Sequence, residues 1–321
     1  MKNTMTNTPG LRNIGNSPGY ETLHDVTFSR GNLALYTLKG YLIPESTLIR
    51  GPEGFIARKK TQEKIGPPVN TPVIEDPVTY AGDLSGTWGH FLTECSSRLW
   101  FFFEHPEFWN YQKFFCTRHP DRRHIHTLLK FSGITNLKMM NRDIHFKTLY
   151  MPYSAFQNRH NAYKVHSLFH EEIAKQFGPY VQEDKILYLS RRKMPNNKRK
   201  VHGEKELENH IKSLGGDIMY PEQTPVRDQI VAINSYSTVI SCRGSALHSI
   251  LFRVNPDPFK PIMLAAEGVS SNYHLVDAVK GIDTIYIRNS TTKDPNCKKK
   301  KTRQDEISNI DFIKKELDKV L

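Results

Sequence analysis

Short apolar runs and helical patterns alternate along most of the chain, which predicts an α/β fold. Between Val26 and Val78 the apolar runs are separated by glycine and proline, as is typical of strands joined by turns. From residue 181 to residue 287 strand and helix patterns follow one another, which predicts a mostly parallel, doubly wound sheet. The preceding helical pattern stops at Gly178-Pro179, so we expect a domain boundary between Gly178 and Glu183.

This pattern divides the chain into four parts. Residues 1–20 are rich in Asn, Thr, Gly and Pro and are expected to form a flexible N-terminal arm. Residues 21–180 and 181–297 are expected to form two α/β domains, and residues 298–321 a basic linker followed by a terminal amphipathic helix.

The segment from Asp83 to Glu104 is predicted to begin in a glycine-rich loop, Gly82 to Gly86, and to continue as a helix with one buried face. Its apolar positions recur at helical spacing at Trp88, Phe91, Leu92, Cys95 and Leu99. His90 and Glu94 lie one helical turn apart, so the carboxylate can reach and orient the imidazole. The alternative is an ordinary helix that carries one satisfied histidine at the edge of its buried face.

A second informative stretch runs from Ser237 to Phe252. Thr238 to Cys242 reads as a strand, Arg243-Gly244-Ser245 as a turn and Ala246 onward as a helix. Gly244 allows close approach of the backbone to a ligand, and Ser245 can cap the first turn, so free N–H groups converge on a place suited to phosphate. The alternative is an ordinary turn between a strand and a helix.

Basic residues cluster directly after the predicted strand Ile186 to Ser190. Six of the ten residues from Arg191 to Lys200 are cationic. Open α/β sheets bind ligands at the carboxyl ends of their strands, although a basic run is often only a solvated loop. A different pair, His166 and His170, is four residues apart on a predicted helix from Ala162 to Phe177, and we interpret both as surface histidines because no third metal ligand is in view.

Charge and cysteine content narrow the class of partner and compartment. The 321 residues carry 45 Lys and Arg against 33 Asp and Glu, a formal charge of +12 that favours an anionic partner: a nucleotide, nucleic acid, acidic glycan or lipid head group. The four cysteines form no Cys-x-x-Cys pair, so we expect reduced thiols in a cytoplasmic protein. No apolar run is long enough to cross a bilayer, so membrane contact is expected only at an anionic surface, such as the inner face of the membrane.

Three motifs, taken in order, resemble glycosyltransferase family 61, in particular its bacterial polysaccharide-type members. They are Gly89-His90-Phe91-Leu92-Thr93-Glu94; Tyr188-Leu189-Ser190-Arg191-Arg192 followed by Arg199 and Glu204; and Gln229 followed by Gly244-Ser245-Ala246-Leu247 and Phe252. Two positions depart from the family pattern. Arg243 stands where the family commonly has His, and Gly203 stands where Asn commonly precedes the glutamate.

The resemblance implies two Rossmann-like domains facing a central cleft, the GT-B arrangement. It also implies inversion at the anomeric carbon, a nucleotide sugar donor, expected to be a UDP-sugar, and a glycan or lipid-linked glycan acceptor, as in capsule, lipopolysaccharide or other cell-surface polysaccharide synthesis. The C-terminal domain would hold the donor, and the N-terminal domain the acceptor.

The predicted donor-site and catalytic residues follow from the motifs and the resemblance together. The donor-site residues are Arg191, Arg192, Arg199, Glu204, Gln229, Arg243, Gly244, Ser245 and Ala246. His90 is the predicted base, oriented by Glu94, and Asp83 is the alternative base. The sequence has no Asp-x-Asp triplet, so we expect no metal or other cofactor, and arginines would neutralise the leaving diphosphate.

Two competing interpretations remain at this point. A nucleic-acid-binding α/β protein would also explain the positive charge, but aromatic residues do not interleave with the basic run, so no nucleic-acid partner is expected. A non-catalytic scaffold of the same fold is the other alternative, for which the Arg243 departure is the one hint.

Overall fold

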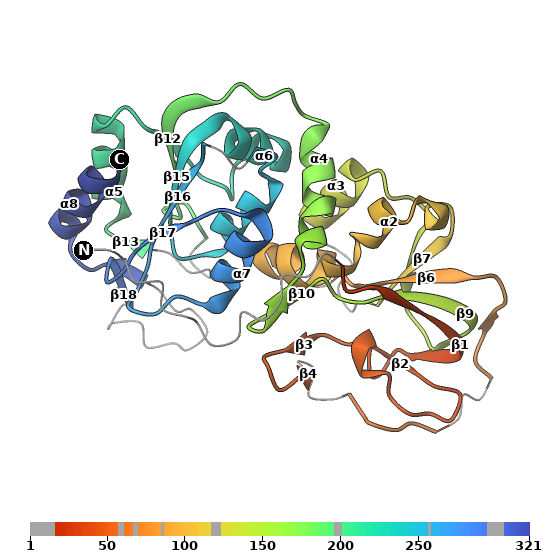
Figure 1. Ribbon diagram of the computed structural model, residues 1–321. Helices are drawn as coiled ribbons and strands as arrows, with labels where there is room; N and C mark the ends of the chain where they lie inside the picture. Colours follow the sequence, from red (N-terminus) through yellow and green to blue (C-terminus); the bar gives the residue numbers. More distant parts are fainter. Residues whose placement is uncertain are drawn as a thin grey trace. The chain divides into compact units, whose positions relative to one another are not determined.

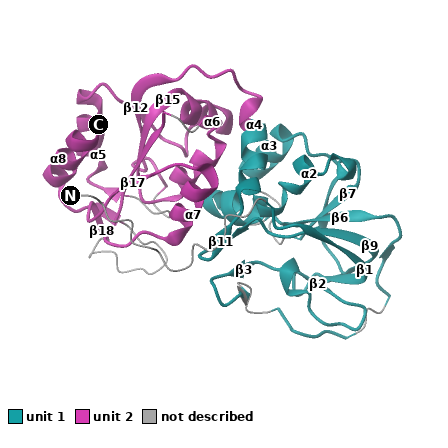
Figure 2. Cartoon of the chain, in the orientation of Figure 1, with its two compact units in different colours: residues 1–173 teal, residues 174–321 magenta. Residues whose placement is uncertain are grey.

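The computed structural model describes residues 17–56, 61–66, 70–84, 87–116, 123–195, 201–255, 258–293 and 305–321. The chain divides into two compact units, residues 1–173 and residues 174–321, each a mixture of sheet and helix (Figure 2). Most of the predicted N-terminal arm, the second half of the basic run with Arg199, and the basic linker lie outside the described residues. No helix in the described ranges is long and apolar enough to cross a membrane.

Unit 1 is built on a seven-stranded mixed sheet in the order β2-β1-β9-β6-β7-β8, with β5 beside β9. Strands β5 to β9 pair in parallel, whereas β1 pairs antiparallel with both β2 and β9. The described strands of this unit are β1 (Tyr20–Ser29), β2 (Ala34–Tyr36), β3 (Ile49–Arg50), β4 (Phe55–Ile56), β5 (Val73–Ile74), β6 (Val78–Asp83), β7 (Gln112–Cys116), β8 (Leu137–Met140), β9 (Ile144–Pro152), β10 (Phe156–Gln157) and β11 (Asn161–Ala162). The Rossmann-like parallel pattern expected of this domain therefore covers only part of the sheet, because β1 and β2 extend it with antiparallel strands.

The helices of unit 1 are short and irregular. They are η1 (Pro44–Ser46), α1 (Trp88–His90), η2 (Phe91–Cys95), η3 (Ser96–Arg98), α2 (Phe101–Glu104), η4 (Pro106–Phe108), α3 (Arg123–Phe131), η5 (Lys164–Ser167) and α4 (Leu168–Lys175), which reaches into unit 2. Figure 1 shows α2 and α3 on one side of the sheet and the segment carrying β3 and β4 on the other. One core cluster joins the sheet strands through side chains such as Phe28, Tyr80 and Phe146.

The helix predicted after Gly86 is present but irregular, and Asp83, predicted in the loop before it, belongs to a strand. Asp83 ends β6, and the segment after it passes from one α-helical turn into a π-helical stretch and then a 3₁₀ turn. Three hydroxyl groups donate to carbonyl oxygens three or four residues earlier: Thr93 to Gly89, Ser96 to Leu92 and Ser97 to Glu94. Such bonds compete with the regular backbone ladder and bend a helix.

The histidine pair on the next predicted helix is buried, so its interpretation as a surface pair is wrong. The helix begins at Lys164 rather than Ala162, because Ala162 belongs to β11. His166 shares a hydrogen bond of 2.9 Å with the carbonyl oxygen of Leu92, and His170 one of 3.3 Å with the Ser96 hydroxyl. Burial lowers the pKa of His166 to about 3, so this ring is neutral. Both rings therefore form hydrogen bonds to the irregular helix from its buried side.

Unit 2 confirms the predicted parallel sheet. Its five strands run in the order β14-β12-β15-β16-β17, and every pair is parallel. A separate three-stranded sheet, β13-β19-β18, was not predicted. The strands of this unit are β12 (Glu183–Leu189), β13 (Val201–His202), β14 (Asp217–Met219), β15 (Tyr236–Cys242), β16 (Lys260–Leu264), β17 (Ile285–Ile287), β18 (Thr291–Lys293) and β19 (Asp305–Ile307).

Helices cover both faces of this parallel sheet (Figure 1). They are α5 (Glu204–Ser213), α6 (Val226–Ser235), η6 (Ser245–Phe252), α7 (Ser271–Lys280) and α8 (Ile310–Val320). Helices α5 and α8 lie on one face, where Leu207, Ile313 and Leu317 pack against inward-facing residues of the strands, and α6 and α7 lie on the other. The predicted terminal amphipathic helix is thus confirmed, and its apolar side completes the core of unit 2.

Candidate active site

The predicted pair His90 and Glu94 is in contact, and a third residue joins it. The His90 Nδ1 atom lies 2.6 Å from Glu94 Oε2. Arg50 donates from Nη2 to the same oxygen at 2.7 Å and from Nε to Glu94 Oε1. The side chain of Glu94 is only 4% exposed, against 51% for His90 and 34% for Arg50. A buried carboxylate is therefore held between two partly exposed basic side chains.

The backbone fixes each member of this Arg50–Glu94–His90 cluster separately. Arg50 lies in the β3–β4 hairpin, which is tied to the end of β10: Gly51 N donates to the Asn158 carbonyl at 2.9 Å, and Gln157 Nε2 donates to the Gly51 carbonyl at 3.0 Å. Glu94 lies in the π-helical stretch η2, one turn after His90. Single π-helical turns of this kind are frequent at functional sites.

Electrostatics decide which nitrogen of His90 carries the proton. Burial alone raises the pKa of Glu94, but the hydrogen bonds from His90 and Arg50 outweigh burial and lower that pKa to about 2. An ionised carboxylate can only accept hydrogen bonds, so His90 Nδ1 must be the donor. In the neutral imidazole the lone pair then lies on Nε2, which is the arrangement that a general base requires.

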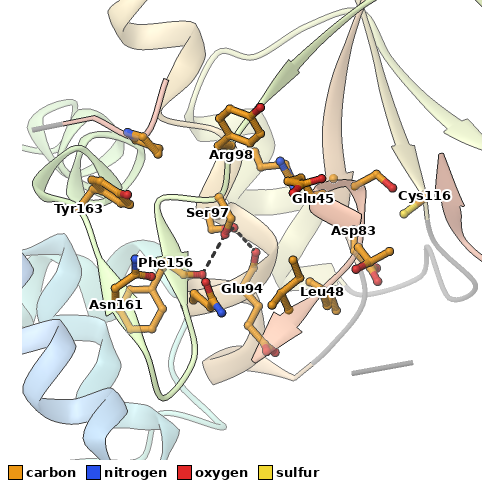
Figure 3. Close-up of a pocket in the computed structure, with 18 of the residues that line it drawn as sticks. Glu45, Leu48, Asp83, Glu94, Ser97, Arg98, Cys116, Phe156, Asn161 and Tyr163 are labelled. Atoms are coloured by element: carbon orange, nitrogen blue, oxygen red, sulfur yellow. Dashed lines mark hydrogen bonds between the residues drawn. The ribbon is translucent and has the colours of Figure 1, made fainter. Parts of the chain in front are cut away.

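A cavity of about 270 Å³ lies beside this cluster in unit 1 (Figure 3). Its wall includes Asp83 and Glu94, the hydroxyl groups of Ser97 and Ser154, and polar or aromatic side chains of the β10–β11 hairpin region, namely Phe156, Gln157, Asn161 and Tyr163. His90 is not one of the lining residues. Hydroxyl, amide and carboxylate groups next to aromatic faces suit a ligand rich in hydroxyl groups.

Arg98 forms part of the same wall and was missed by the sequence analysis. Its guanidinium is buried and donates to the main-chain carbonyls of Pro152 and Glu45, and it lies over the ring of Tyr80. Gly82 makes room for it, because a Cβ atom there would lie 2.9 Å from Arg98 Cδ and Gly82 has a φ of +83°. Gly82 and Arg98 thus shape the part of the cavity wall next to Asp83.

In unit 2 the predicted donor residues gather after two neighbouring strands. Arg191 and Arg192 follow β12, and Arg243 and Gly244 follow β15, which pairs in parallel with β12. The carboxyl ends of parallel strands meet at one edge of a sheet, so these residues share that edge. Gly244 has an extended backbone, and the Arg191 guanidinium occupies the space beside it, so a Cβ atom there would require that side chain to shift.

Glu204, the first residue of α5, binds the loop that follows β12. Its Oε1 atom accepts from the Tyr188 hydroxyl at 2.6 Å and from the Arg191 main-chain N–H at 2.9 Å. Burial raises the pKa of Glu204 to about 7, since these bonds only partly offset it. Gly203 precedes it with a φ of +83°, a conformation that glycine adopts freely and asparagine tolerates, which accounts physically for the departure at this position.

Arg192 is held in place by a second buried glutamate. Its Nε atom lies 2.9 Å from Glu208 Oε2, and Nη2 donates to the Tyr220 hydroxyl at 2.9 Å. The side chain remains 41% exposed. The guanidinium is therefore held by a buried carboxylate and remains accessible to solvent.

The remaining predicted donor residues have structural contacts. Arg243 donates to both carboxylate oxygens of Asp305 in β19 at 3.2 Å, and Gln229 donates to the carbonyls of Pro221 and Thr224. The prediction that Ser245 caps a helix is wrong: the residue at the cap position is Gly244, no side chain caps there, and η6 is a 3₁₀ helix that includes Ser245 and Ala246. The structure therefore brings Arg191, Glu204 and Gly244 together, with Arg192 adjacent, and directs Gln229 to a loop.

No group of three or more His, Cys, Asp or Glu side chains among the described residues could hold a metal ion. The same ranges contain three of the four cysteines, and all three are buried and outside any disulfide there.

Comparison with known proteins places the chain in a family. A model described as Glycosyltransferase 61 matches residues 88–261, more than half of the 321 residues, and this span begins just before His90 and ends after the Gly244 turn. A search of curated proteins found no match. The match confirms the resemblance seen in the three sequence motifs. The chain belongs to glycosyltransferase family 61.

Proposed function

We propose that this glycosyltransferase moves a sugar from a nucleotide sugar, with UDP as the expected nucleotide, to a glycan or lipid-linked glycan acceptor with inversion and without a metal ion. The observation that carries the proposal is the Arg50–Glu94–His90 cluster, in which an ionised carboxylate leaves the lone pair of His90 on Nε2. A base in this form can accept the proton of an acceptor hydroxyl near neutral pH.

The step is a single displacement. The acceptor oxygen forms a bond to the anomeric carbon while the bond from that carbon to the diphosphate oxygen breaks. The hydroxyl proton goes to His90 Nε2, and the electron pair of the broken bond leaves with the nucleotide diphosphate. Glu94 stabilises the imidazolium that forms, since it accepts from Nδ1 throughout.

The acceptor is proposed to use the unit 1 cavity. Its volume of about 270 Å³ suits one sugar-sized group, and its hydroxyl, amide and carboxylate lining suits sugar hydroxyls. Asp83 lies on this wall and His90 does not, which keeps Asp83 as the alternative base.

The donor diphosphate is proposed to bind at the strand ends of unit 2. Arg191 and Arg192 supply positive charge there: the main chain of Arg191 is held by Glu204, the guanidinium of Arg192 is held by Glu208, and Gly244 leaves space beside the Arg191 side chain. Arginines in this role replace a metal ion as the group that neutralises the leaving diphosphate.

At the level of the whole chain we propose a GT-B arrangement in which the donor-binding and acceptor-binding units face one cleft. Transfer of a hexose or pentose during cell-surface polysaccharide synthesis, at the cytoplasmic face of a membrane, is the proposed setting. The formal charge of +12 supports contact with anionic lipid in that setting.

A thermal-shift screen with a panel of nucleotide sugars tests the donor class. A ligand at about 100 times its Kd should stabilise the protein by roughly 2.7 kcal/mol. UDP-sugars should raise Tm, and the effective donor should then support transfer to a glycan acceptor in the presence of a chelator. Stabilisation by oligonucleotides with none by nucleotide sugars would contradict the proposal, and loss of transfer in chelator with recovery in manganese would contradict its metal independence.

A further inference from the structure

Arg50 has no assigned role, and it lies outside the residues matched by the family model. We propose that Arg50 is a positioning residue that acts through Glu94: it locks the carboxylate toward His90 and, by its charge, keeps the imidazole in its proton-accepting form. This inference rests on the proposed role of His90 as the base.

The geometry of the contact supports a lock rather than a simple ion pair. Arg50 engages both oxygens of Glu94, and the oxygen that takes Nη2 at 2.7 Å is the one that lies 2.6 Å from His90 Nδ1. A carboxylate held only by the imidazole could rotate about its last bond. Held at both oxygens by a planar guanidinium, it keeps one oxygen directed at Nδ1.

The charge of Arg50 explains how it would keep the imidazole of His90 in its proton-accepting form. The charged or titratable groups that act on Glu94 are His90 from its own helical segment and Arg50 from the β3–β4 hairpin, and Cys95 acts on Arg50. Asp83, Glu45 and Arg98 belong to the cavity wall that Glu94 shares. A carboxylate without a cationic partner would favour the imidazolium more than one that is paired with a guanidinium. Because Arg50 neutralises much of that negative charge, the proton is released more easily between turnovers.

A purely structural role for Arg50 would be to pin the hairpin. Main-chain atoms already do this, since the Gly51 N–H donates to Asn158 and the Gly51 carbonyl accepts from Gln157. Changing the Arg50 side chain should therefore leave the hairpin in place and alter the charge beside Glu94.

The first test compares pH–rate profiles of the wild-type enzyme, Arg50→Gln and Arg50→Lys. In Arg50→Gln the acidic limb of kcat/KM should move to higher pH by roughly 0.5 to 1 unit, as expected for a lost charge one carboxylate away. Arg50→Lys keeps the charge but loses the two-point contact, so its limb should stay near that of the wild type while kcat falls. An unmoved limb in Arg50→Gln would overturn the proposal.

The second test asks whether Arg50 acts through Glu94. In a double-mutant cycle, Arg50→Gln should have almost no further effect on kcat/KM in the Glu94→Gln variant. Additive losses from the two substitutions would assign Arg50 a separate role.

A third readout needs no activity. The side-chain NMR titration of His90, assigned by its absence in His90→Ala, should move to higher pH in Arg50→Gln and stay unchanged in Arg142→Gln, an exposed arginine between β8 and β9 used as the control. A shift without transfer from any donor would support the Arg50 lock and contradict the proposed function. Sugar transfer without a shift of the His90 titration would support the proposed function and contradict the role of Arg50.

Discussion

Each unit contains a buried glutamate among its candidate site residues, and the two glutamates have opposite acidities. Glu94 is 5% exposed and Glu204 1% exposed. Burial alone would raise the pKa of both. The pKa of Glu94 is nevertheless lowered to about 2, while that of Glu204 is raised to about 7.

The donors around each carboxylate account for the difference. Glu94 accepts from a guanidinium and an imidazole, so its charged form is strongly favoured. Glu204 Oε1 accepts from a phenol and a main-chain N–H, both neutral, and its Oε2 is buried without a hydrogen-bond partner in the described part of the chain. Equal burial therefore leads to a fixed charge in unit 1 and to a group that exchanges its proton near neutral pH in unit 2.

The largest expected effect comes from removing His90, the proposed base, which Glu94 contacts. His90→Ala should lower kcat by roughly 10²- to 10⁴-fold while donor affinity stays unchanged, because the lost interaction belongs to the transition state. Steady-state kinetics and donor titration calorimetry measure the two quantities. His126→Ala, an exposed histidine on α3, is the matched control. If His90→Ala is mild and Asp83→Asn causes the large loss, the base is Asp83.

The second prediction compares the two glutamates directly. Glu94→Gln should reduce the free energy of unfolding by about 3 kcal/mol, because it removes charge-assisted bonds to two basic partners. Glu204→Gln should cost less than about 1 kcal/mol at pH 6, since an amide resembles the protonated acid and still accepts from Tyr188. Denaturation followed by hydrogen exchange in each unit measures both. Equal losses would show that the opposite acidities have no consequence for stability.

The third prediction concerns Arg192, the proposed cation of the donor site, which Glu208 holds in place. Arg192→Ala should weaken nucleotide binding by about 1.5 to 3 kcal/mol, the range for one charge-assisted contact. Lys193→Ala is the neighbouring control, and it should have a smaller effect because Lys193 lies over the ring of Tyr220 rather than in a paired geometry. Unchanged affinity in Arg192→Ala by calorimetry would remove Arg192 from the donor site.

The smallest expected effect is the pH dependence of stability. Glu204 binds its proton more tightly in the folded state, so the free energy of unfolding of unit 2 should fall by about 1 kcal/mol between pH 6 and pH 8. Burial also raises the pKa of Asp277 to about 7, and this adds a loss of the same sign. The pH dependence that Glu94 contributes has the opposite sign, because its pKa is lowered in the folded state. Its stabilisation is present above the unfolded pKa and is lost as the pH falls toward 2. Glu204→Gln should remove its share of the pH 6 to 8 loss, measured by urea titration at both pH values. An identical slope in wild type and variant would assign that slope to other groups.

The sequence determined the features that depend on neighbouring residues. The spacing of His90 and Glu94 predicted their contact because one helical turn joins them even when that turn is distorted. The alternation of strands and helices after Gly178 predicted the parallel sheet of unit 2 and the shared edge where Arg191 and Gly244 meet, because parallel strands place their carboxyl ends together.

Tertiary structure alone decided what those residues can do. Arg50 reaches Glu94 across 44 positions of sequence, and no local pattern marks such a contact. His166 and His170 looked like surface residues because their spacing says nothing about the Leu92 and Ser96 groups that bury and bind them. The acidities of Glu94 and Glu204 depend in the same way on which donors the fold brings to each carboxylate, and long-range packing, rather than residue type, supplies those donors.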